Sequence, residues 1–160
     1  MLPAAEATQI FEEAEVLYSE SEVANALERM AQEISAQLAD RYPLVLCVMG
    51  GAVVFAGQLL PKLVFPLDFD YVQASRYGDA IRGGQIMWKV PPPANVKGRV
   101  VLVLDDILDE GITLAEIRRC VMELGAAECY SAVFVNKLIG RSKPVQADFV
   151  GLEVPDRYVF

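Results

Sequence analysis

The apolar residues of this chain occur in short continuous runs that alternate with segments of helical spacing. Leu44–Met49 and Val100–Leu104 are continuous apolar runs, the pattern of strands that are buried on both faces of a sheet. Leu67–Gln73 alternates apolar with polar residues, which predicts a further strand. Three shorter β-rich runs complete the predicted strands: Gln85–Val90, Ser131–Val135 and Phe149–Val154.

Other segments carry apolar residues three and four positions apart, as one face of a helix does. This spacing predicts helices over Ser21–Ala39, Val53–Leu60 and Thr113–Leu124. Residues 19–22 match the capping-box pattern Ser-x-x-Glu at the start of the first helix, and Gly125 is suited to end the last one. Ser75–Gly84 contains three glycines and several polar residues, which predicts a mobile loop.

The order of these elements, with strands and helices alternating along 160 residues, predicts a fold of the α/β class. We expect a mainly parallel, twisted sheet flanked by helices, in a single domain over residues 1–160, because the chain has neither repeats nor a dividing linker. Ligands bind such sheets outside the carboxyl ends of the strands. Three segments are therefore expected to converge on one site: Met49–Gly51, Asp105–Thr113 and Asn136–Arg141.

The composition narrows the classes of function. Lys and Arg number 14 against 22 Asp and Glu, and the resulting net charge of −8 disfavours nucleic-acid binding, which depends on neutralising phosphates. The chain has no histidine, which excludes the usual zinc sites and histidine-based catalysis. The three cysteines are scattered in apolar runs and are expected to be reduced core thiols.

The sequence also predicts where the protein works. No apolar run approaches the roughly 20 residues that a membrane span needs, so we expect no membrane partner. Residues 1–15 contain four glutamates and no basic residue, unlike a signal or transit peptide. These two features together predict a cytoplasmic protein.

The most informative segment, Asp105–Thr113, follows an apolar run directly. Four carboxylates here would be costly to bury without partners, so a polyhydroxylated or metal-bound ligand explains them best. Asp105 and Asp106 can accept hydrogen bonds from a vicinal diol such as that of a ribose. The turn after them can present backbone amides to a phosphate, because Gly111 allows close approach and the next helix adds its positive end. The segment therefore predicts a site for a ribose 5-phosphate.

Each part of this segment also has a purely structural interpretation. Thr113 and Glu116 match a capping box, so Thr113 taken alone is equally well explained as a helix cap. Asp105 or Asp106 taken alone is typical of a surface turn, although the complete string is much more specific than its parts. An acidic pair and a lysine also mark receiver-type signalling domains. In those domains the pair follows the first strand, whereas here it follows a late one.

The string closely resembles the signature of the type I phosphoribosyltransferases, which is an acidic pair, two apolar residues, Asp, Thr, Gly, any residue and Thr. The resemblance implies the fold of that family, with a small hood formed by the terminal segments. It also implies transfer of a phosphoribosyl group from 5-phosphoribosyl-1-pyrophosphate to a nitrogen nucleophile. Glu110 stands where the family commonly has Thr or Ser, so only its backbone is expected to contact the phosphate. The ribose- and phosphate-binding residues implied are Asp105, Asp106, Asp109, Glu110, Gly111, Ile112 and Thr113.

Two further segments resemble the hypoxanthine-guanine branch of this family. Met49 and Gly50 stand where that branch has its pyrophosphate loop, often Leu-Lys-Gly. Because Met49 replaces the lysine, pyrophosphate contacts are expected from backbone amides, and the cis peptide typical of that loop is not expected. Arg76 and Tyr77 resemble part of the mobile loop that closes over the site in this branch and keeps water out.

The same resemblance implies how a purine and a metal ion bind. Lys137 matches a lysine that donates to the exocyclic 6-oxo group, which selects hypoxanthine or guanine over adenine. Arg141 keeps a basic residue near the pyrophosphate. Phe149 is expected to stack on the base and Val150 to read it through its backbone. Ile107 is a further purine contact, and Asp156 is expected to bind Mg²⁺.

The resemblance thus implies a Mg²⁺-dependent hypoxanthine-guanine phosphoribosyltransferase of purine salvage, with Asp109 and Lys137 as catalytic residues. Asp109 would lie near purine N7 and handle the proton there. The substrates are small molecules, and a homo-oligomer, dimer or tetramer, is expected from the family. The alternative is a non-catalytic regulator of the same fold that binds phosphoribosyl pyrophosphate or nucleotides. Met49 and the end of the chain at Phe160 favour that alternative.

Overall fold

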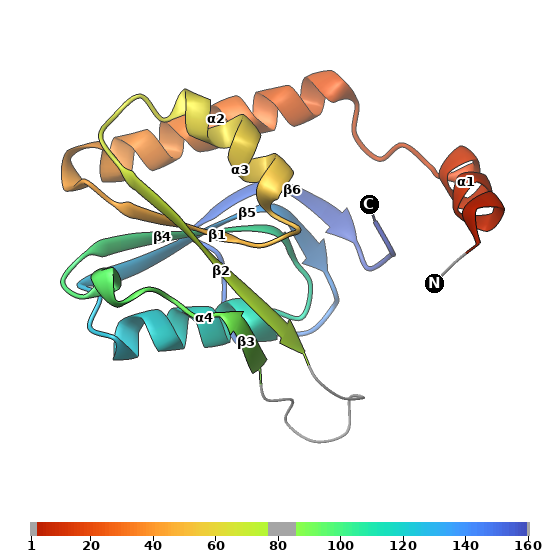
Figure 1. Cartoon of the computed structure of the whole chain (residues 1–160). Helices are drawn as coiled ribbons and strands as arrows, with labels where there is room; N and C mark the ends of the chain where they lie inside the picture. The colour runs from red at the N-terminus through yellow and green to blue at the C-terminus, as the bar shows by residue number, and fades with distance from the viewer. Residues whose placement is uncertain (1–2, 77–85, 160) are drawn as a thin grey trace.

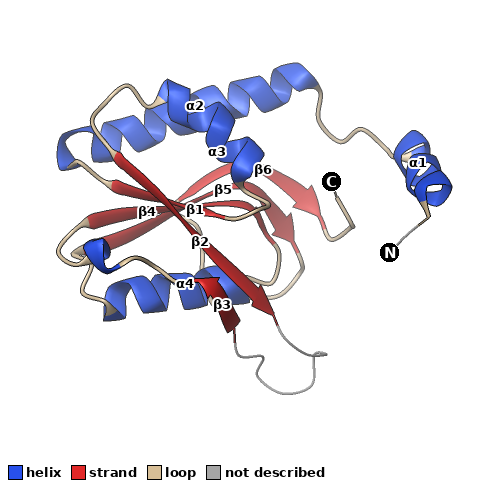
Figure 2. Cartoon of the chain, viewed as in Figure 1, coloured by secondary structure: helices blue, strands red, loops and turns tan. Residues whose placement is uncertain are grey.

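Six strands form one sheet in the computed structural model, which describes residues 3–76 and 86–159. The strand order is β3-β2-β1-β4-β5-β6, and every neighbouring pair is parallel except β2 with β3. Figure 2 shows the twist of this sheet. The prediction of a mainly parallel sheet is confirmed. The strands are β1 (Leu44–Val48), β2 (Asp68–Arg76), β3 (Ile86–Val90), β4 (Val100–Leu108), β5 (Glu128–Leu138) and β6 (Phe149–Pro155).

Helices cover both faces of the sheet (Figure 1). On one face lie α2 (Glu20–Leu38) and α3 (Val53–Leu59), and on the other lies α4 (Ile112–Glu123). The Ser19 hydroxyl accepts a hydrogen bond from the backbone amide of Glu22, and the carboxylate of Glu22 accepts one from the backbone amide of Ser19. The predicted capping box at the start of α2 is therefore present. Among the described residues, none of the helices combines the length and the apolar character that crossing a membrane requires. Short 3-10 turns are η1 (Ala39–Arg41), η2 (Leu60–Lys62) and η3 (Ala94–Val96).

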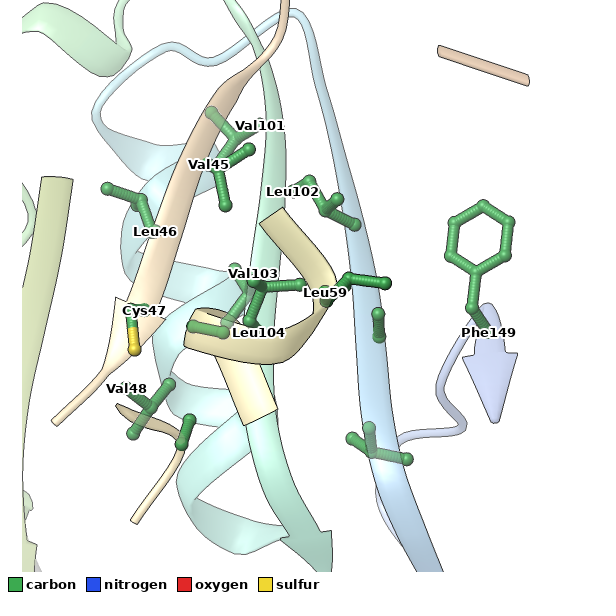
Figure 3. Close-up of a cluster of buried hydrophobic side chains, with 14 of the residues drawn as sticks. Val45, Leu46, Cys47, Val48, Leu59, Val101, Leu102, Val103, Leu104 and Phe149 are labelled. Atoms are coloured by element: carbon green, nitrogen blue, oxygen red, sulfur yellow. The ribbon is translucent and has the colours of Figure 1, made fainter. Parts of the chain in front are cut away.

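The core lies around the two central strands, β1 and β4. All five residues of Leu44–Val48 are buried, as are Val101–Leu104 in the neighbouring strand (Figure 3). Each fully buried Leu or Val contributes about 1.5–3 kcal/mol relative to an exposed one. The residues that follow Leu104 therefore continue from a strand that is anchored in the hydrophobic core.

β4 and β5 are longer than predicted. Their parallel pairing continues past the apolar runs, through Asp105 with Val133 and up to Leu108 with Asn136. The acidic pair therefore lies within a strand and not in the turn after it. The hydrophobic pattern missed this extension because backbone pairing does not require apolar side chains.

The helix α1 (Ala4–Glu13) was not predicted, and none of its residues is buried. The linker after it contacts the end of β6, because Glu15 pairs with Arg157 at 3.0 Å and the Tyr18 hydroxyl donates to the carbonyl oxygen of Glu153. Figure 1 shows the two chain ends on the same side of the molecule. The terminal segments thus meet, as the expected hood requires.

Candidate active site

A pocket of about 230 Å³ opens at the carboxyl end of β4. Two of the predicted segments border this region. The acidic string lines the pocket, and Met49–Gly51 directly follows Val48, which lines it as well. A Cβ added to Gly51 would lie 2.4 Å from Oδ2 of Asp106, so the turn after β1 rests directly on that carboxylate. The lining residues are Val48, Asp105, Asp106, Ile107, Leu108, Asp109, Glu110, Gly111, Thr113 and Leu114.

Asp105 and Asp106 form a coupled acidic pair at the base of this pocket. Asp105 is only 9% exposed, and its Oδ1 accepts a hydrogen bond from the backbone amide of Asp106 at 3.1 Å. The carboxylate of Asp106 accepts from the amide of Ile107 at 2.9 Å. Burial, and then the neighbouring charge of Asp106, raises the pKa of Asp105 to about 8. The pair therefore offers a neutral carboxyl that can donate and accept, which suits a pair of sugar hydroxyls.

The turn after β4 leads into α4 through a left-handed glycine. Gly111 has φ 82° and occupies the N-cap position, and the helix begins at Ile112. The first backbone amides of a helix lack acceptors within the helix, and the helix dipole adds a positive field there. This turn can therefore hold a phosphate. The capping-box interpretation of Thr113 is wrong, since Thr113 is the second helical residue and Gly111 is the cap.

Lys137 and Asp109 meet at the mouth of the pocket from two neighbouring strands. Nζ of Lys137, on β5, lies 3.1 Å from Oδ2 of Asp109, the first residue after β4. Lys137 is 9% exposed, so its charge is largely withdrawn from water. A buried ammonium requires such a partner. The convergence of the segments after β4 and β5 is thus confirmed, and it joins an acid and a cation beside the pocket.

Arg141 pairs with Glu110 on the outer side of the phosphate turn. Nη2 of Arg141 lies 2.6 Å from Oε1 of Glu110; the Arg141 side chain is largely exposed and that of Glu110 is partly buried. Glu110, which departs from the family pattern, therefore has its negative charge neutralised by Arg141. Arg141 reaches the turn, where a pyrophosphate could contact it.

The loop between β1 and α3 departs from expectation in one respect. The peptide bond between Met49 and Gly50 is cis, so the expectation of an ordinary peptide there is wrong. The amide of Met49 donates to the carbonyl of Val72 at 2.8 Å, which ties the loop to β2. The side chain of Met49 packs against the core and carries no charge.

Phe149 and Val150 do not reach the pocket. Phe149 is 5% exposed and belongs to the cluster of buried hydrophobic side chains (Figure 3). Its ring centroid lies 6.4 Å from that of Tyr130. The carbonyl of Val150 accepts hydrogen bonds from the guanidinium of Arg29, at 3.2 Å to each of its two terminal nitrogens. Their assignment as base-contacting residues is therefore corrected: both belong to the start of β6 and to the core. Ile107 does line the pocket.

The expected mobile loop falls mainly outside the described residues, and Tyr77 is among those. Arg76 is the last residue of β2 and pairs with Ile86 of β3. Asp156 lies just after β6 and is exposed. It is close enough to Lys143 to affect that side chain's pKa.

The donors present suit Mg²⁺ brought by a substrate. The described part of the chain contains no cluster of three or more Cys, Asp or Glu side chains that could form a closed metal cage. Mg²⁺ usually binds through one or two carboxylates together with substrate phosphates and water. Asp105 and Asp106 at the pocket and Asp156 at the end of β6 supply carboxylates of this kind.

Two residues near the site, Lys143 and Tyr158, were missed by sequence reasoning. Lys143 is bonded to the ends of both β4 and β5, and no sequence pattern marks it. Tyr158 is 85% exposed and follows β6, two residues after Asp156, which makes it an accessible aromatic ring at the carboxyl edge.

The fold and this site together define a phosphoribosyltransferase. The chain belongs to that family, since the model of the phosphoribosyl transferase domain matches residues 13–160. It is 30% identical over 145 residues to the hypoxanthine-guanine phosphoribosyltransferase of Bacillus subtilis (strain 168), covering 90% of this chain and 81% of that protein. The hypoxanthine-guanine branch inferred from the sequence is thereby confirmed.

Solved structures agree with this placement. The chain resembles a hypoxanthine-guanine-xanthine phosphoribosyltransferase with a TM-score of 0.75 at 30% identity, covering 90% of this chain and 80% of that one. Its fold also matches a hypoxanthine-guanine phosphoribosyltransferase from Bacillus anthracis with a TM-score of 0.81 at 23% identity, over 91% and 84% of the two chains. The expected fold class is therefore confirmed.

Proposed function

We propose that this chain transfers the 5-phosphoribosyl group from 5-phosphoribosyl-1-pyrophosphate to N9 of a 6-oxopurine. The products are IMP or GMP and pyrophosphate, as in purine salvage. The family membership and the hypoxanthine-guanine relatives support this activity. Within this proposal residues 1–160 act as one phosphoribosyltransferase domain, which the single sheet and the match over residues 13–160 support.

The acidic pair and the turn after it bind the sugar phosphate. The carboxyl groups of Asp105 and Asp106 hold the ribose hydroxyls, and the carboxylate of Asp106 offsets the positive charge that develops at the anomeric carbon during displacement. The backbone of Glu110, Gly111 and Ile112, with Thr113, binds the 5-phosphate at the start of α4. The pocket that all of these residues except Ile112 line supports the assignment.

The Lys137–Asp109 pair handles the purine. Lys137 donates to the 6-oxo group, which an adenine lacks, and Asp109 takes or holds the proton at N7. The two side chains are already in contact at 3.1 Å, and a purine bound in the pocket would turn its O6–N7 edge toward them. Ile107 packs against the base, and the exposed ring of Tyr158 is the aromatic surface on which it can stack, in place of Phe149.

Mg²⁺ is proposed as the cofactor. It neutralises the pyrophosphate leaving group when bound. Asp156 and the acidic pair are the residues that would hold it, largely through the oxygens of the substrate. Gly50 and the backbone of Met49, with Arg141, are proposed to orient the pyrophosphate from the protein side. A homo-oligomer and a cytoplasmic location stay predictions of the sequence.

The observation that carries the proposal is the contact of Lys137 with Asp109 beside a pocket lined by four carboxylates and a helix start. The experiment is a steady-state assay of the purified protein with phosphoribosyl pyrophosphate, Mg²⁺ and each of hypoxanthine, guanine, xanthine and adenine. We expect turnover of 6-oxopurines and none of adenine, with activity lost on chelation of Mg²⁺ and restored by its return. Turnover of adenine alone would refute the substrate assignment. Calorimetric binding of phosphoribosyl pyrophosphate without product formation would identify the non-catalytic regulator instead.

A further inference from the structure

Lys143 ties together the ends of the two strands that carry the site. Its ammonium donates to the carbonyl oxygens of Leu108 at 2.6 Å and Lys137 at 2.6 Å, and to Oδ1 of Asn136 at 2.8 Å. An ammonium has three N–H donors, so these bonds account for all of them. Leu108 ends β4 while Asn136 and Lys137 lie near the end of β5, which means that one side chain bridges both strands.

This bridge stands where the pairing of β4 with β5 stops. The last paired residues are Leu108 and Asn136, and the next residues along each chain are Asp109 and Lys137. Beyond that pair the ladder between the two strands no longer sets their separation. Lys143 sets this separation instead, because its ammonium donates to the carbonyl oxygen of Leu108 on β4 and to that of Lys137 on β5. The 3.1 Å contact between Asp109 and Lys137 depends on that separation.

The stem of Lys143 also supports the phosphate turn. A Cβ added to Gly111 would lie 3.4 Å from Cβ of Lys143 and 3.3 Å from Cγ1 of Val145, so residues 143–145 pack against the back of the turn. Lys143 is partly buried, and burial lowers the pKa of its ammonium. A cation removed from water is tolerated only while its hydrogen bonds are made. The segment is therefore held in place by the same bonds that hold the strands.

We propose that Lys143 is a positioning residue for phosphoribosyl transfer, holding the ends of β4 and β5 at the separation that brings Asp109 and Lys137 into register beside the pocket. Lys143 is not among the residues that line the pocket, so it acts through the other two. This inference rests on the proposed function for its kinetic readout.

The test is a double-mutant cycle with Lys143→Met and Asp109→Asn. Methionine keeps the apolar stem and removes the ammonium. We expect Lys143→Met to lower kcat by about tenfold to a hundredfold, the order of loss that misplacing a catalytic group causes. In the Asp109→Asn background, Lys143→Met should lower kcat hardly any further, because the carboxylate that Lys143 positions is already gone. Lys62→Met, on an exposed lysine paired with Glu28, is the matched control and should leave kcat unchanged.

The outcomes separate the hypotheses. A wild-type protein without any phosphoribosyl transfer refutes the proposed function. An active wild type with an unaffected Lys143→Met variant refutes only the positioning role. Equal losses in both backgrounds also overturn it, because a general loss of stability adds to any other change. If Lys143→Met does not fold, Lys143→Arg replaces it, since arginine keeps the charge but not the three-point geometry. It should fold with reduced kcat and the same non-additivity, and wild-type turnover by this variant overturns the proposal.

Discussion

The ammonium of Lys137 lies 3.1 Å from the carboxylate of Asp109, although the two residues are 28 positions apart and lie at the ends of different strands. The contact places a hydrogen-bond donor and a proton acceptor side by side at the edge of the pocket. A 6-oxopurine carries its carbonyl oxygen and N7 on the same edge, so under the proposed function Lys137 and Asp109 would each meet one of these two substrate atoms. Without substrate each side chain satisfies the charge of the other.

Replacing Asp109 by asparagine should abolish most of the activity without affecting the fold. We expect kcat to fall by at least about 10²-fold, the usual contribution of a general acid–base group. The fold should be retained, because the asparagine oxygen can still accept a hydrogen bond from Lys137, but the melting temperature should fall modestly, because the buried ammonium loses its countercharge. Asp40→Asn, on an exposed residue of η1, is the matched control. Unchanged kcat in Asp109→Asn would show that this carboxylate has no part in the reaction.

A methyl group at Gly51 should impair substrate binding. The added Cβ would lie 2.4 Å from Oδ2 of Asp106, so either the loop or the carboxylate has to move. We expect Gly51→Ala to raise KM for phosphoribosyl pyrophosphate by about tenfold, equivalent to about 1.4 kcal/mol of lost binding. Gly57→Ala is the control, because nothing lies within 4 Å of its added Cβ within α3. It should keep wild-type kinetics and gain roughly 0.5–1 kcal/mol of stability.

The raised pKa of Asp105 predicts how stability depends on pH. Burial, and then the charge of Asp106, raises the pKa of Asp105 from 3.8 to about 8. Between these values the folded protein keeps a proton that the unfolded chain has lost, so the free energy of unfolding falls as pH rises through this window. Asp105→Asn removes the titrating group. Urea unfolding of both proteins between about pH 5 and pH 8 should show a shallower decline for the variant. Parallel declines would contradict the raised pKa.

Tyr158 and Phe149 should respond in opposite ways to truncation. Phe149→Ala removes a buried ring from the core and should lower the free energy of unfolding by about 3–5 kcal/mol. Tyr158→Ala removes an exposed ring, so the free energy of unfolding should stay the same while KM for the purine rises several-fold. Chemical denaturation and steady-state kinetics on both variants give the comparison. A stable Phe149→Ala protein with weakened purine binding would reinstate the assignment made from sequence.

The pairing of Glu110 with Arg141 predicts a gain from removing the acid. Glu110→Gln takes a negative charge away from the phosphate turn and releases Arg141 from its ion pair. Exposed pairs of this kind are worth about 0–1 kcal/mol, so KM for phosphoribosyl pyrophosphate should fall by no more than about fivefold. The decrease should be smaller at high salt, because screening weakens exposed charges. A raised KM would show that the carboxylate itself helps to bind the substrate.

Much of the fold could be read from the hydrophobic pattern, because buried parallel strands and amphipathic helices follow directly from it. The ends of β4 and β5 could not, since the residues that extend them, such as Asp105 and Lys137, are polar. They pair through backbone bonds that no side-chain pattern records. The predicted start of α4, at Thr113, lies one residue after the observed start at Ile112. The sequence pattern missed this because Gly111 caps the helix through its left-handed backbone and not through a side chain.

The candidate site was predictable where its residues are contiguous in sequence. Every residue of the string from Asp105 to Thr113 except Ile112 lines the pocket. Lys143 could not be found in this way, because its importance comes from three acceptors supplied by two strands. Phe149 was misassigned because an aromatic residue at a strand start looks the same in sequence whether its ring faces a ligand or the core.

The contact of Arg29 with the carbonyls of Val150 and Gly151 has a consequence beyond the site. β6 is the outermost strand on its side of the sheet, and an outermost strand with vacant acceptors invites a strand of another molecule. Successive carbonyls of a strand point to opposite sides, so the guanidinium from α2 fills one of those edge acceptors. The protein thereby shields this border against strand-to-strand aggregation and can keep its catalytic end open.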